Sequence, residues 1–251
     1  MFNGNPRQTS SLAGYIDAHV HLTHADALQD LANAGIAAVR DAGTKQGTGL
    51  ALRRAAAQDG WPVIISAGRA LSCRGGYGAF LGTAVETRGE IAAEISRLRN
   101  DGADIIKVIA SGIVDLEQPG AVTAGGFSAD DLRFIVEEAG RHGLGVMAHA
   151  NGEEVIRTAA EAGVRSIEHG FFMTEAALAV LAVRKTFWVP TVGALQRAAE
   201  APDVTEAVRV SIGRTITDHL RMVWRAFYLG VPLAIGTDCV HRSRSRRSAQ
   251  R

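Results

Sequence analysis

The sequence is short of cysteine, of net charge and of long apolar runs, and each shortage excludes a class of protein. Its 251 residues include two cysteines, Cys73 and Cys239, which cannot form a disulfide framework and favour a reducing compartment. A formal net charge of +1 provides no global field to attract nucleic acid or an anionic membrane. No segment approaches the roughly 20 apolar residues of a membrane-spanning helix, and the N-terminal stretch lacks the apolar run of a signal peptide. We therefore expect a cytoplasmic protein that acts on a small molecule.

Aromatic residues and lysine are also scarce. Aromatics make up 6% of the chain and apolar residues in total 47%, so the core must consist mainly of aliphatic side chains, as is typical of helices packed on a buried parallel sheet. Among 27 basic residues the lysines are Lys45, Lys107 and Lys185. The chain uses arginine for its surface cations. A lysine inside an apolar strand therefore calls for an explanation of its own.

Short apolar runs alternate with longer segments of helical periodicity along most of the chain. The runs predict strands at 15–20, 36–40, 62–66, 104–109, 145–149, 164–168, 187–191 and 231–236. The segments between them predict helices at 25–34, 48–58, 86–100, 128–142, 152–162, 174–183 and 206–228. Such alternation gives parallel strands with right-handed crossovers, and eight strands fit the ~250 residues of a (β/α)8 TIM barrel. An open doubly wound sheet is the alternative, but no GxGxxG motif follows the first strand.

One domain is predicted: an α/β barrel over residues 14–240 that lacks a helix after its eighth strand. Residues 1–13 are expected to be an N-terminal extension and the basic stretch 241–251 a disordered tail. The longest connections, all of which follow strands, are 67–85, 110–127 and 192–205. Connections that follow strands lie on the catalytic face of a barrel, and the glycine-rich first one is expected to form a wall or lid over it.

Histidines gather at the carboxyl ends of the predicted strands. His19 and His21 alternate along the first strand, so both imidazoles share one face and can reach one metal ion. An isolated pair of this kind could equally be two hydrogen-bonded histidines. The fifth and sixth strands end in His149 and His169 and the eighth ends in Asp238, each of which alone could be structural. Their common placement at strand ends indicates a metal site on the catalytic face.

Lys107 lies inside the apolar strand DIIKVI. A buried lysine loses solvation and its pKa falls, and a neutral amine can form a Schiff base or react with carbon dioxide to give a carbamate that bridges two metal ions. The alternative is a lysine whose charged end reaches the rim of the barrel. Asp17, one step deeper than His19 on the same strand face, is a candidate to orient a ligand.

Together these motifs resemble those of the amidohydrolase superfamily over residues 14–240. IDAHVHL is similar to its first-strand motif, IKVIASG to its lysine-bearing fourth strand, and VMAHANG, SIEHG and IGTDC to its later ligand strands. The stretches VRDAG, SAGRALS and GVRSIEHG are most similar to the branch of prolidase-like dipeptidases and imidazolonepropionase-like proteins. The small β-sandwich domain that relatives carry is not expected in this chain.

The resemblance implies a binuclear metal-dependent hydrolase with two divalent ions, expected to be zinc. It assigns His19, His21 and Asp238 to the more buried ion, His149 and His169 to the more exposed one, and a carboxylated Lys107 to the bridge between them. It also implies that a metal-bridged hydroxide attacks the scissile carbonyl, while Asp238 accepts its proton and passes it to the leaving amine.

The expected reaction is cleavage of an amide bond in a dipeptide, an Xaa-Pro dipeptide or an N-acyl amino acid. The free carboxylate of such a substrate needs a partner, and the candidates are Arg69, Arg74, Tyr77 and Asn151. A single metal ion would instead fit a cyclic-amide hydrolase similar to imidazolonepropionase, or a deaminase.

The sequence also fits a second class of interpretation, which starts from an exposed apolar edge. Without an eighth helix, the apolar side chains of Val231, Leu233 and Ile235 would be exposed at the edge of the barrel. The chain could then be a non-catalytic truncated remnant, or a homo-oligomer that covers this edge.

Overall fold

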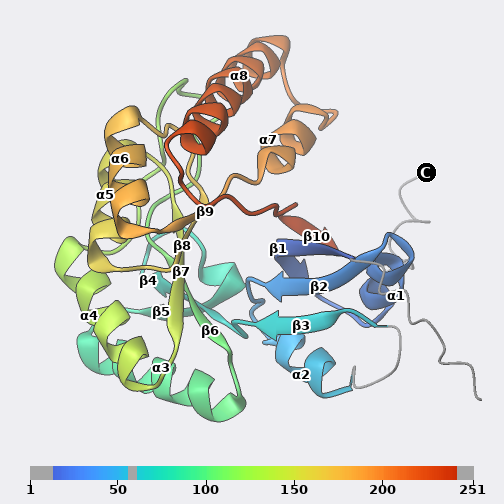
Figure 1. Cartoon of the computed structure of the whole chain (residues 1–251), viewed down its shortest axis with the longest axis vertical. Coiled ribbons are helices and arrows are strands. Elements are labelled where there is room, and N and C mark those ends of the chain that lie inside the picture. The colour runs from blue at the N-terminus through green and yellow to red at the C-terminus, as the bar shows by residue number, and fades with distance from the viewer. Residues whose placement is uncertain (1–13, 56–60, 242–251) are drawn as a thin grey trace, which may run out of the picture.

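The chain forms two parallel β-sheets with helices around them (Figure 1). The computed structural model describes residues 14–55 and 61–241. The strand order is β10-β1-β2-β3 in the first sheet and β5-β4-β6-β7-β8-β9 in the second. The strands are β1 (Tyr15–Leu22), β2 (Ile36–Asp41), β3 (Val63–Ser66), β4 (Ala70–Cys73), β5 (Gly82–Val85), β6 (Ile105–Ile109), β7 (Gly145–Ala150), β8 (Ser166–His169), β9 (Phe187–Val189) and β10 (Cys239–His241).

Helices cover the outer sides of the sheets, with α3 to α6 along the larger sheet and α1 and α2 beside the smaller one (Figure 1). The helices are α1 (Asp26–Asn33), α2 (Thr48–Ala55), α3 (Arg88–Asp101), α4 (Ala129–Arg141), α5 (Glu153–Ala162), α6 (Glu175–Arg184), α7 (Val192–Ala199) and α8 (Glu206–Tyr228), with a short 3-10 helix η1 (Ala79–Leu81). Thr87, Ser128, Thr174 and Thr205 precede four of them and accept a backbone hydrogen bond from the first turn. Within the described ranges, no helix combines the length and apolarity needed to cross a bilayer.

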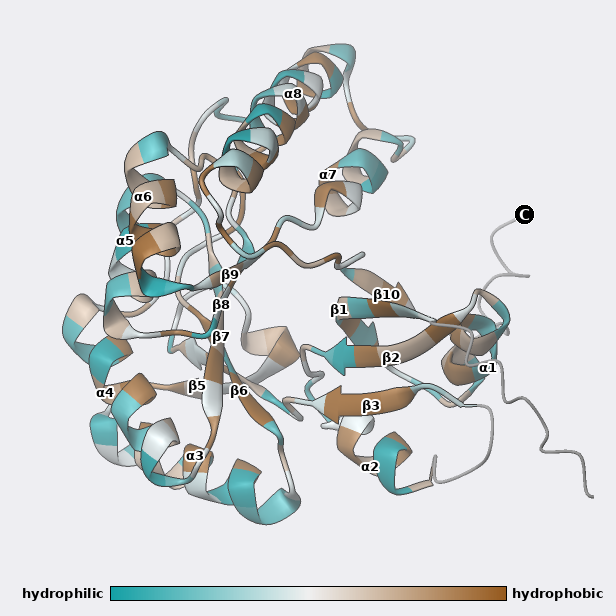
Figure 2. Cartoon of the chain, in the orientation of Figure 1, coloured by the Kyte–Doolittle hydropathy of each residue, from teal (hydrophilic) through white to brown (hydrophobic). Residues whose placement is uncertain are grey.

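The largest hydrophobic core lies between the six-stranded sheet and its helices. β6 is buried along its whole length, and Ile106 and Val108 belong to one cluster with Ile95 of α3 and Ile135 of α4. Figure 2 shows the matching pattern: β3 and β6 are mostly hydrophobic, whereas the helices alternate hydrophobic and hydrophilic surfaces. A charged side chain inside such a strand is therefore costly unless a polar site receives it.

β3 and β4 are two halves of one bent segment that joins the sheets. β3 pairs with β2, whereas β4 pairs with β5 and β6. Between them Gly68 has a positive φ of 69°, and a Cβ at this position would lie 2.6 Å from Leu50 Cδ1. Glycine is therefore the residue that permits the bend.

The segment 232–238 connects the other edges of the two sheets. The backbone of Trp188 in β9 exchanges hydrogen bonds with Pro232 and Ala234, while β1 bonds Ile235 and Asp238. Together with the bend at Gly68, these contacts give an α/β domain of TIM-barrel-like architecture, the predicted fold class.

The first seven predicted strands and the predicted helices are confirmed to within two residues, apart from residues 56–58 of the second helix, which lie outside the described residues. Two of the long predicted connections, 67–85 and 192–205, contain further elements that were not predicted: β4 and β5 in the first and α7 in the second. β4 and β5 are four residues each, too short for a periodicity signal. Their close approach requires glycine, since a Cβ on Gly82 would lie 2.0 Å from the Ala70 carbonyl oxygen.

The predicted eighth strand at 231–236 is also wrong. In this stretch Leu233 forms a single bridge with Trp188, and Pro232 has no N–H to donate to a ladder. The regular pairing with β1 begins later, at β10, where His241 pairs with Leu22. His241 therefore belongs to a strand rather than to the predicted tail, while 1–13 and 242–251 lie outside the described residues.

The predicted apolar edge is mostly covered. Val231 is 4% exposed, and Leu233 packs against the main core. Ile235 is the member of the predicted trio that is exposed, at 73%. The cover comes from α8 and β9, whose residues share the core cluster with Val231.

His219 of α8 links pH to folding stability. It is buried between Phe171 and Trp188, and its Nε2 donates to the Pro190 carbonyl oxygen at 3.0 Å. Burial lowers the pKa of His219 from 6.5 to about 4. The unfolded chain therefore binds this proton at a higher pH than the folded chain does, and stability is lost as the pH falls from 6.5 towards 4.

We predict that His219→Phe flattens the pH dependence of the free energy of unfolding over this range. A single proton contributes at most roughly 1.4 kcal/mol per pH unit, so the wild-type slope should decrease by up to that amount. Urea unfolding of the metal-free proteins, followed by tryptophan fluorescence, measures both slopes. Equal slopes of unfolding free energy against pH in the two proteins would contradict the assignment of this pH dependence to His219.

Candidate metal centre

The carboxyl ends of the strands border one cavity of about 300 Å³. Its polar lining contains all the residues predicted as metal ligands and two of the residues predicted to bind substrate: His19, His21, Lys107, His149, His169 and Asp238, with Tyr77 and Asn151. These residues are far apart in the sequence and meet because parallel strands present their carboxyl ends to the same face.

β1 directs two imidazoles into the cavity. His19 Nδ1 lies 2.6 Å from Glu168 Oε2, and His21 Nδ1 lies 2.6 Å from the Gly43 carbonyl oxygen. Because a carboxylate and a carbonyl oxygen accept hydrogen bonds, Nδ1 carries the proton in both rings. The Nε2 atoms are therefore left as lone-pair donors.

His149 and His169 are held in the same way. His149 Nε2 donates to the Gly112 carbonyl oxygen at 2.9 Å, and His169 Nδ1 lies 2.7 Å from Thr191 Oγ1. Their ring centroids are 4.5 Å apart. Burial lowers the pKa of His149 to about 3, helped by the Lys107 charge, and it holds the pKa of His169 well below its ordinary value. Both rings are therefore neutral at physiological pH, the form that binds metal.

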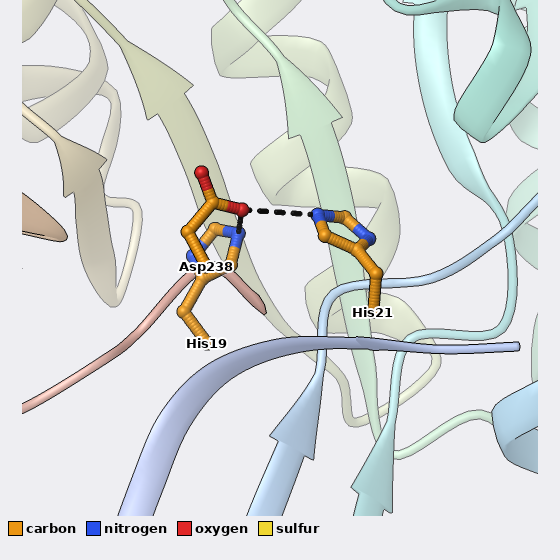
Figure 3. Close-up of side chains that lie close together, drawn as sticks. All are labelled: His19, His21 and Asp238. Atoms are coloured by element: carbon orange, nitrogen blue, oxygen red, sulfur yellow. Dashed lines mark ion pairs between the residues drawn. The ribbon is translucent and has the colours of Figure 1, made fainter. Parts of the chain in front are cut away.

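Three potential ligand atoms converge on one point (Figure 3). Asp238 Oδ1 lies 3.5 Å from His19 Nε2 and 3.4 Å from His21 Nε2. Bonds of 2.0–2.2 Å in a tetrahedral arrangement around zinc would separate the ligand atoms by about 3.4 Å. His19 Nε2 is buried without a hydrogen-bond partner among the described residues, which is costly unless a cation takes its lone pair. The spacing and the unpartnered nitrogen fit a divalent metal ion.

Lys107 is 1% exposed, so the alternative of a lysine that reaches solvent at the rim is wrong. Its Nζ has no hydrogen-bond partner in the described part of the chain. Burial lowers the pKa of Lys107 to about 8, against the opposing charges of Glu168 and Asp238. A fraction of the amine is therefore neutral near physiological pH and chemically available.

Glu168 and Arg40 were not among the predicted site residues. Glu168 is fully buried in β8, where it accepts hydrogen bonds from His19, from Ser166 and, at 2.8 Å, from Arg40 Nη2. Burial opposes ionisation, but Arg40 and His19 together hold the pKa of Glu168 at about 2. The ionised carboxylate orients His19 and makes its free nitrogen more basic. The available signal is a charge within an apolar strand, the same signal that identifies Lys107.

The backbone around Asp238 is held from two sides. Asp17 accepts hydrogen bonds from the N–H groups of His19 and Thr237 and from the Thr237 hydroxyl. Arg197 of α7 donates to the carbonyl oxygens of Thr237 and Asp238. Asp238 has a positive φ of 54°, a costly conformation that persists where surrounding contacts fix it. Asp17 thus orders the ligand-bearing backbone rather than an imidazole ring.

Two predicted substrate-binding residues border the cavity. Tyr77 lies between β4 and β5, with its ring 5.3 Å from that of His149, and Leu81 from the same segment also lines the wall. The glycine-rich connection therefore forms part of a wall, as predicted. Asn151 has both ends of its amide engaged, because Nδ2 donates to the Gly112 carbonyl oxygen and Oδ1 accepts from the Phe171 N–H.

Arg69 and Arg74 do not border the cavity. Arg69 forms ion pairs with Glu94 at 3.0 Å and Asp101 at 2.9 Å, both on α3. Arg74 pairs with two glutamates at and before the start of α3. The physical reason is local. Acidic residues of α3, and one before it, lie beside β4 and form ion pairs with both guanidinium groups.

Comparisons with known proteins identify the class of protein. The model of the Amidohydrolase family matches residues 11–249, so the chain belongs to the amidohydrolase family, as the motifs predicted. It is 30% identical to an ochratoxinase of Aspergillus niger over 155 residues, which are 61% of this chain and 31% of that protein. It is 27% identical over 244 residues to an uncharacterized protein of Mycobacterium tuberculosis, covering 90% of this chain and 63% of that protein.

Solved structures of other proteins have a similar fold. A Xaa-Pro dipeptidase with methionine bound in its active site is 25% identical, with a TM-score of 0.75 over 91% of this chain and 66% of that chain. The A. niger ochratoxinase structure is 23% identical, with a TM-score of 0.78 over 90% of this chain and 63% of that chain. The chain spans less than two thirds of the length of the curated relatives that it matches.

We predict that Glu168→Gln weakens zinc binding by about 10- to 100-fold, because it removes the charge that orients His19 while keeping the side-chain size. Competition with a chromophoric chelator measures the affinity. Glu94→Gln is the matched control, since Glu94 is equally buried but pairs with Arg69 away from the cavity. An unchanged zinc affinity in folded Glu168→Gln protein would show that the carboxylate does not support the centre.

Proposed function

We propose that the chain is a metal-dependent hydrolase that cleaves amide bonds in small molecules. The observation that carries this proposal is the convergence of four histidines in one cavity, each with one ring nitrogen within hydrogen-bond distance of a protein oxygen. The relatives named ochratoxinase and Xaa-Pro dipeptidase support the amide as the reacting group. The amides to test are dipeptides, including Xaa-Pro, N-acyl amino acids, and amides without a carboxylate.

His19, His21 and Asp238 would hold one divalent ion, expected to be zinc, and His149 and His169 a second. When bound, such ions lower the pKa of water and polarise a carbonyl group. The protein positions the imidazoles through Glu168 and the backbone carbonyls, so that little rearrangement is needed on metal binding.

Asp238 is the proposed proton carrier. Burial would raise the pKa of Asp238, but its contacts with His21 and the neighbouring histidines hold that pKa well below the ordinary value. Asp238 is therefore ionised at neutral pH and can accept a proton from water, then pass it to the amine nitrogen as the carbon–nitrogen bond breaks. Arg197 and Asp17 keep the carboxylate in place through the adjacent backbone.

Lys107 is the proposed bridging ligand, in carboxylated form. Its neutral amine nitrogen would bond to the carbon of carbon dioxide and lose one proton, which gives an anionic carbamate. Two observations support this: the Nζ atom is buried among the histidines, and it has no hydrogen-bond partner in the described residues. A carbamate would supply the oxygen ligands that the histidine pair His149 and His169 lacks.

A second candidate is a one-metal enzyme that opens a cyclic amide or deaminates its substrate. It is favoured by one observation: His19, His21 and Asp238 already form a compact three-ligand cluster. In that case Lys107 would remain an amine and the second pair of histidines would contact substrate. The metal stoichiometry separates the two candidates.

We predict that Asp238→Asn lowers kcat for amide hydrolysis by at least about 100-fold, because the amide cannot carry a proton. Asp218→Asn is the matched control, since Asp218 is exposed on α8 and pairs with Arg221. Release of amine from a panel of dipeptides and N-acyl compounds measures the rates in zinc-loaded protein. Asp238→Asn protein that turns over at the wild-type rate would exclude the proposed role.

We also predict that Lys107→Met lowers the number of zinc ions bound per chain from two to one, and that bicarbonate does not restore the second. Lys45→Met, at an exposed position after β2, should leave the stoichiometry unchanged. Elemental analysis after gel filtration makes the comparison. Two ions retained by Lys107→Met protein would rule out the carbamate bridge.

A further inference from the structure

Beside the candidate ligands, the cavity has a wall of apolar side chains. It comes from the segment after β6, from Phe171 after β8, from α7 and from the connection between β4 and β5. Its apolar members are Leu81, Ile113, Val114, Leu116, Phe171, Ala194, Leu195 and Ala198. Val114, Phe171 and Leu195 also form a buried cluster with Ile212 of α8, so this wall is packed from behind and is fixed in shape.

The basic side chains that could form an ion pair with a substrate carboxylate are bound to other groups or assigned to the metal centre. Among the described residues that line the cavity, Lys107 is the one basic side chain besides the histidines, and the proposed function assigns it to the metal centre. Arg69 is bound to Glu94 and Asp101. Arg197 is bound to the backbone carbonyls of Thr237 and Asp238.

The neutral polar groups on the wall offer little more. The Asn151 amide is occupied by the backbone of Gly112 and Phe171. The phenol of Tyr77 lies beside His149 and carries no charge. A carboxylate placed against this wall would therefore be desolvated without an ionic partner, and that is strongly unfavourable.

Resting on the proposed amide hydrolysis, we propose that this wall selects neutral amides that carry an apolar group, aromatic or branched aliphatic, on the carbon next to the scissile nitrogen. In a dipeptide or an N-acyl amino acid, that carbon also bears the carboxylate, which would meet the wall. A cavity of about 300 Å³ is at the small end of ligand pockets. The preferred substrate class is thus a small acylated arylalkylamine or alkylamine rather than a peptide.

The test compares two substrates that differ only by the carboxylate, N-acetylphenethylamine and N-acetyl-L-phenylalanine. Zinc-loaded enzyme is assayed with both by the amine that is released. We expect kcat/KM to be at least about ten-fold higher for N-acetylphenethylamine, in line with the discrimination that one group in an apolar pocket provides. Equal values, or a preference for the carboxylate compound, would overturn the proposal.

A charge placed on the wall should change the preference. Ile113 lines the cavity and is 43% exposed, so Ile113→Arg should fold, and it should shift the ratio of kcat/KM towards N-acetyl-L-phenylalanine by at least about ten-fold. Gln118→Arg is the matched control: it adds the same charge to the same loop at an exposed position outside the cavity. An unchanged ratio in Ile113→Arg protein would show that the wall does not set the preference.

Calorimetric binding of the same two compounds separates this proposal from the proposed function. If neither compound is hydrolysed but N-acetylphenethylamine binds at least about ten-fold more tightly, the assignment of amide hydrolysis fails and the apolar subsite stands. If both are hydrolysed but the acid binds as tightly as the neutral compound, the reaction stands and the subsite assignment fails.

Discussion

The candidate metal centre depends on imidazoles that are buried with one ring nitrogen satisfied and the other free. A neutral histidine has one donor and one acceptor nitrogen. In His19, His21 and His149 a carboxylate or carbonyl oxygen accepts from the donor nitrogen, and His169 Nδ1 lies 2.7 Å from the Thr191 hydroxyl. Burial lowers the pKa of three of them, His19, His149 and His169, so protonation does not occupy the free nitrogen at neutral pH. A buried ring nitrogen without a partner, as at His19 Nε2, is unfavourable by itself, and a cation is a partner that fits it.

The fold supplies these contacts through neighbouring strands. Gly43 follows β2 and holds the histidine of β1, Gly112 follows β6 and holds that of β7, and Thr191 follows β9 and holds that of β8. Each neighbour is hydrogen-bonded in parallel register, so the loop after one strand lies beside the end of the next. β8 adds Glu168, whose hydrogen bond with His19 of β1 links the two sheets at the site. Apolar side chains complete the lining of the same cavity.

The sequence allowed the regular part of this architecture and the meeting of the candidate ligands in one cavity to be predicted, because both depend on local patterns. Apolar runs marked the strands, and histidines at their ends marked the face. The features that were not predicted depend on contacts between residues far apart in the sequence. β4 and β5 are too short to show periodicity and depend on the close approach of Gly82 to Ala70, and the displaced last strand depends on Pro232 and on pairing with Leu22. Glu168 is a charge within an apolar strand, but its role follows only from its contacts with Arg40 and His19, and the ion pairs of Arg69 with α3 cannot be read from its loop.

The measurement that tests this account most directly is the metal content of the wild-type chain after growth with zinc and bicarbonate. Elemental analysis should find about two zinc ions per folded chain if the four histidines, Asp238 and a carboxylated Lys107 form the two proposed sites. A value of one would keep the His19, His21 and Asp238 cluster and favour the one-metal chemistry. A folded chain that binds no divalent ion would contradict the central claim that the unpartnered nitrogens are directed at a metal.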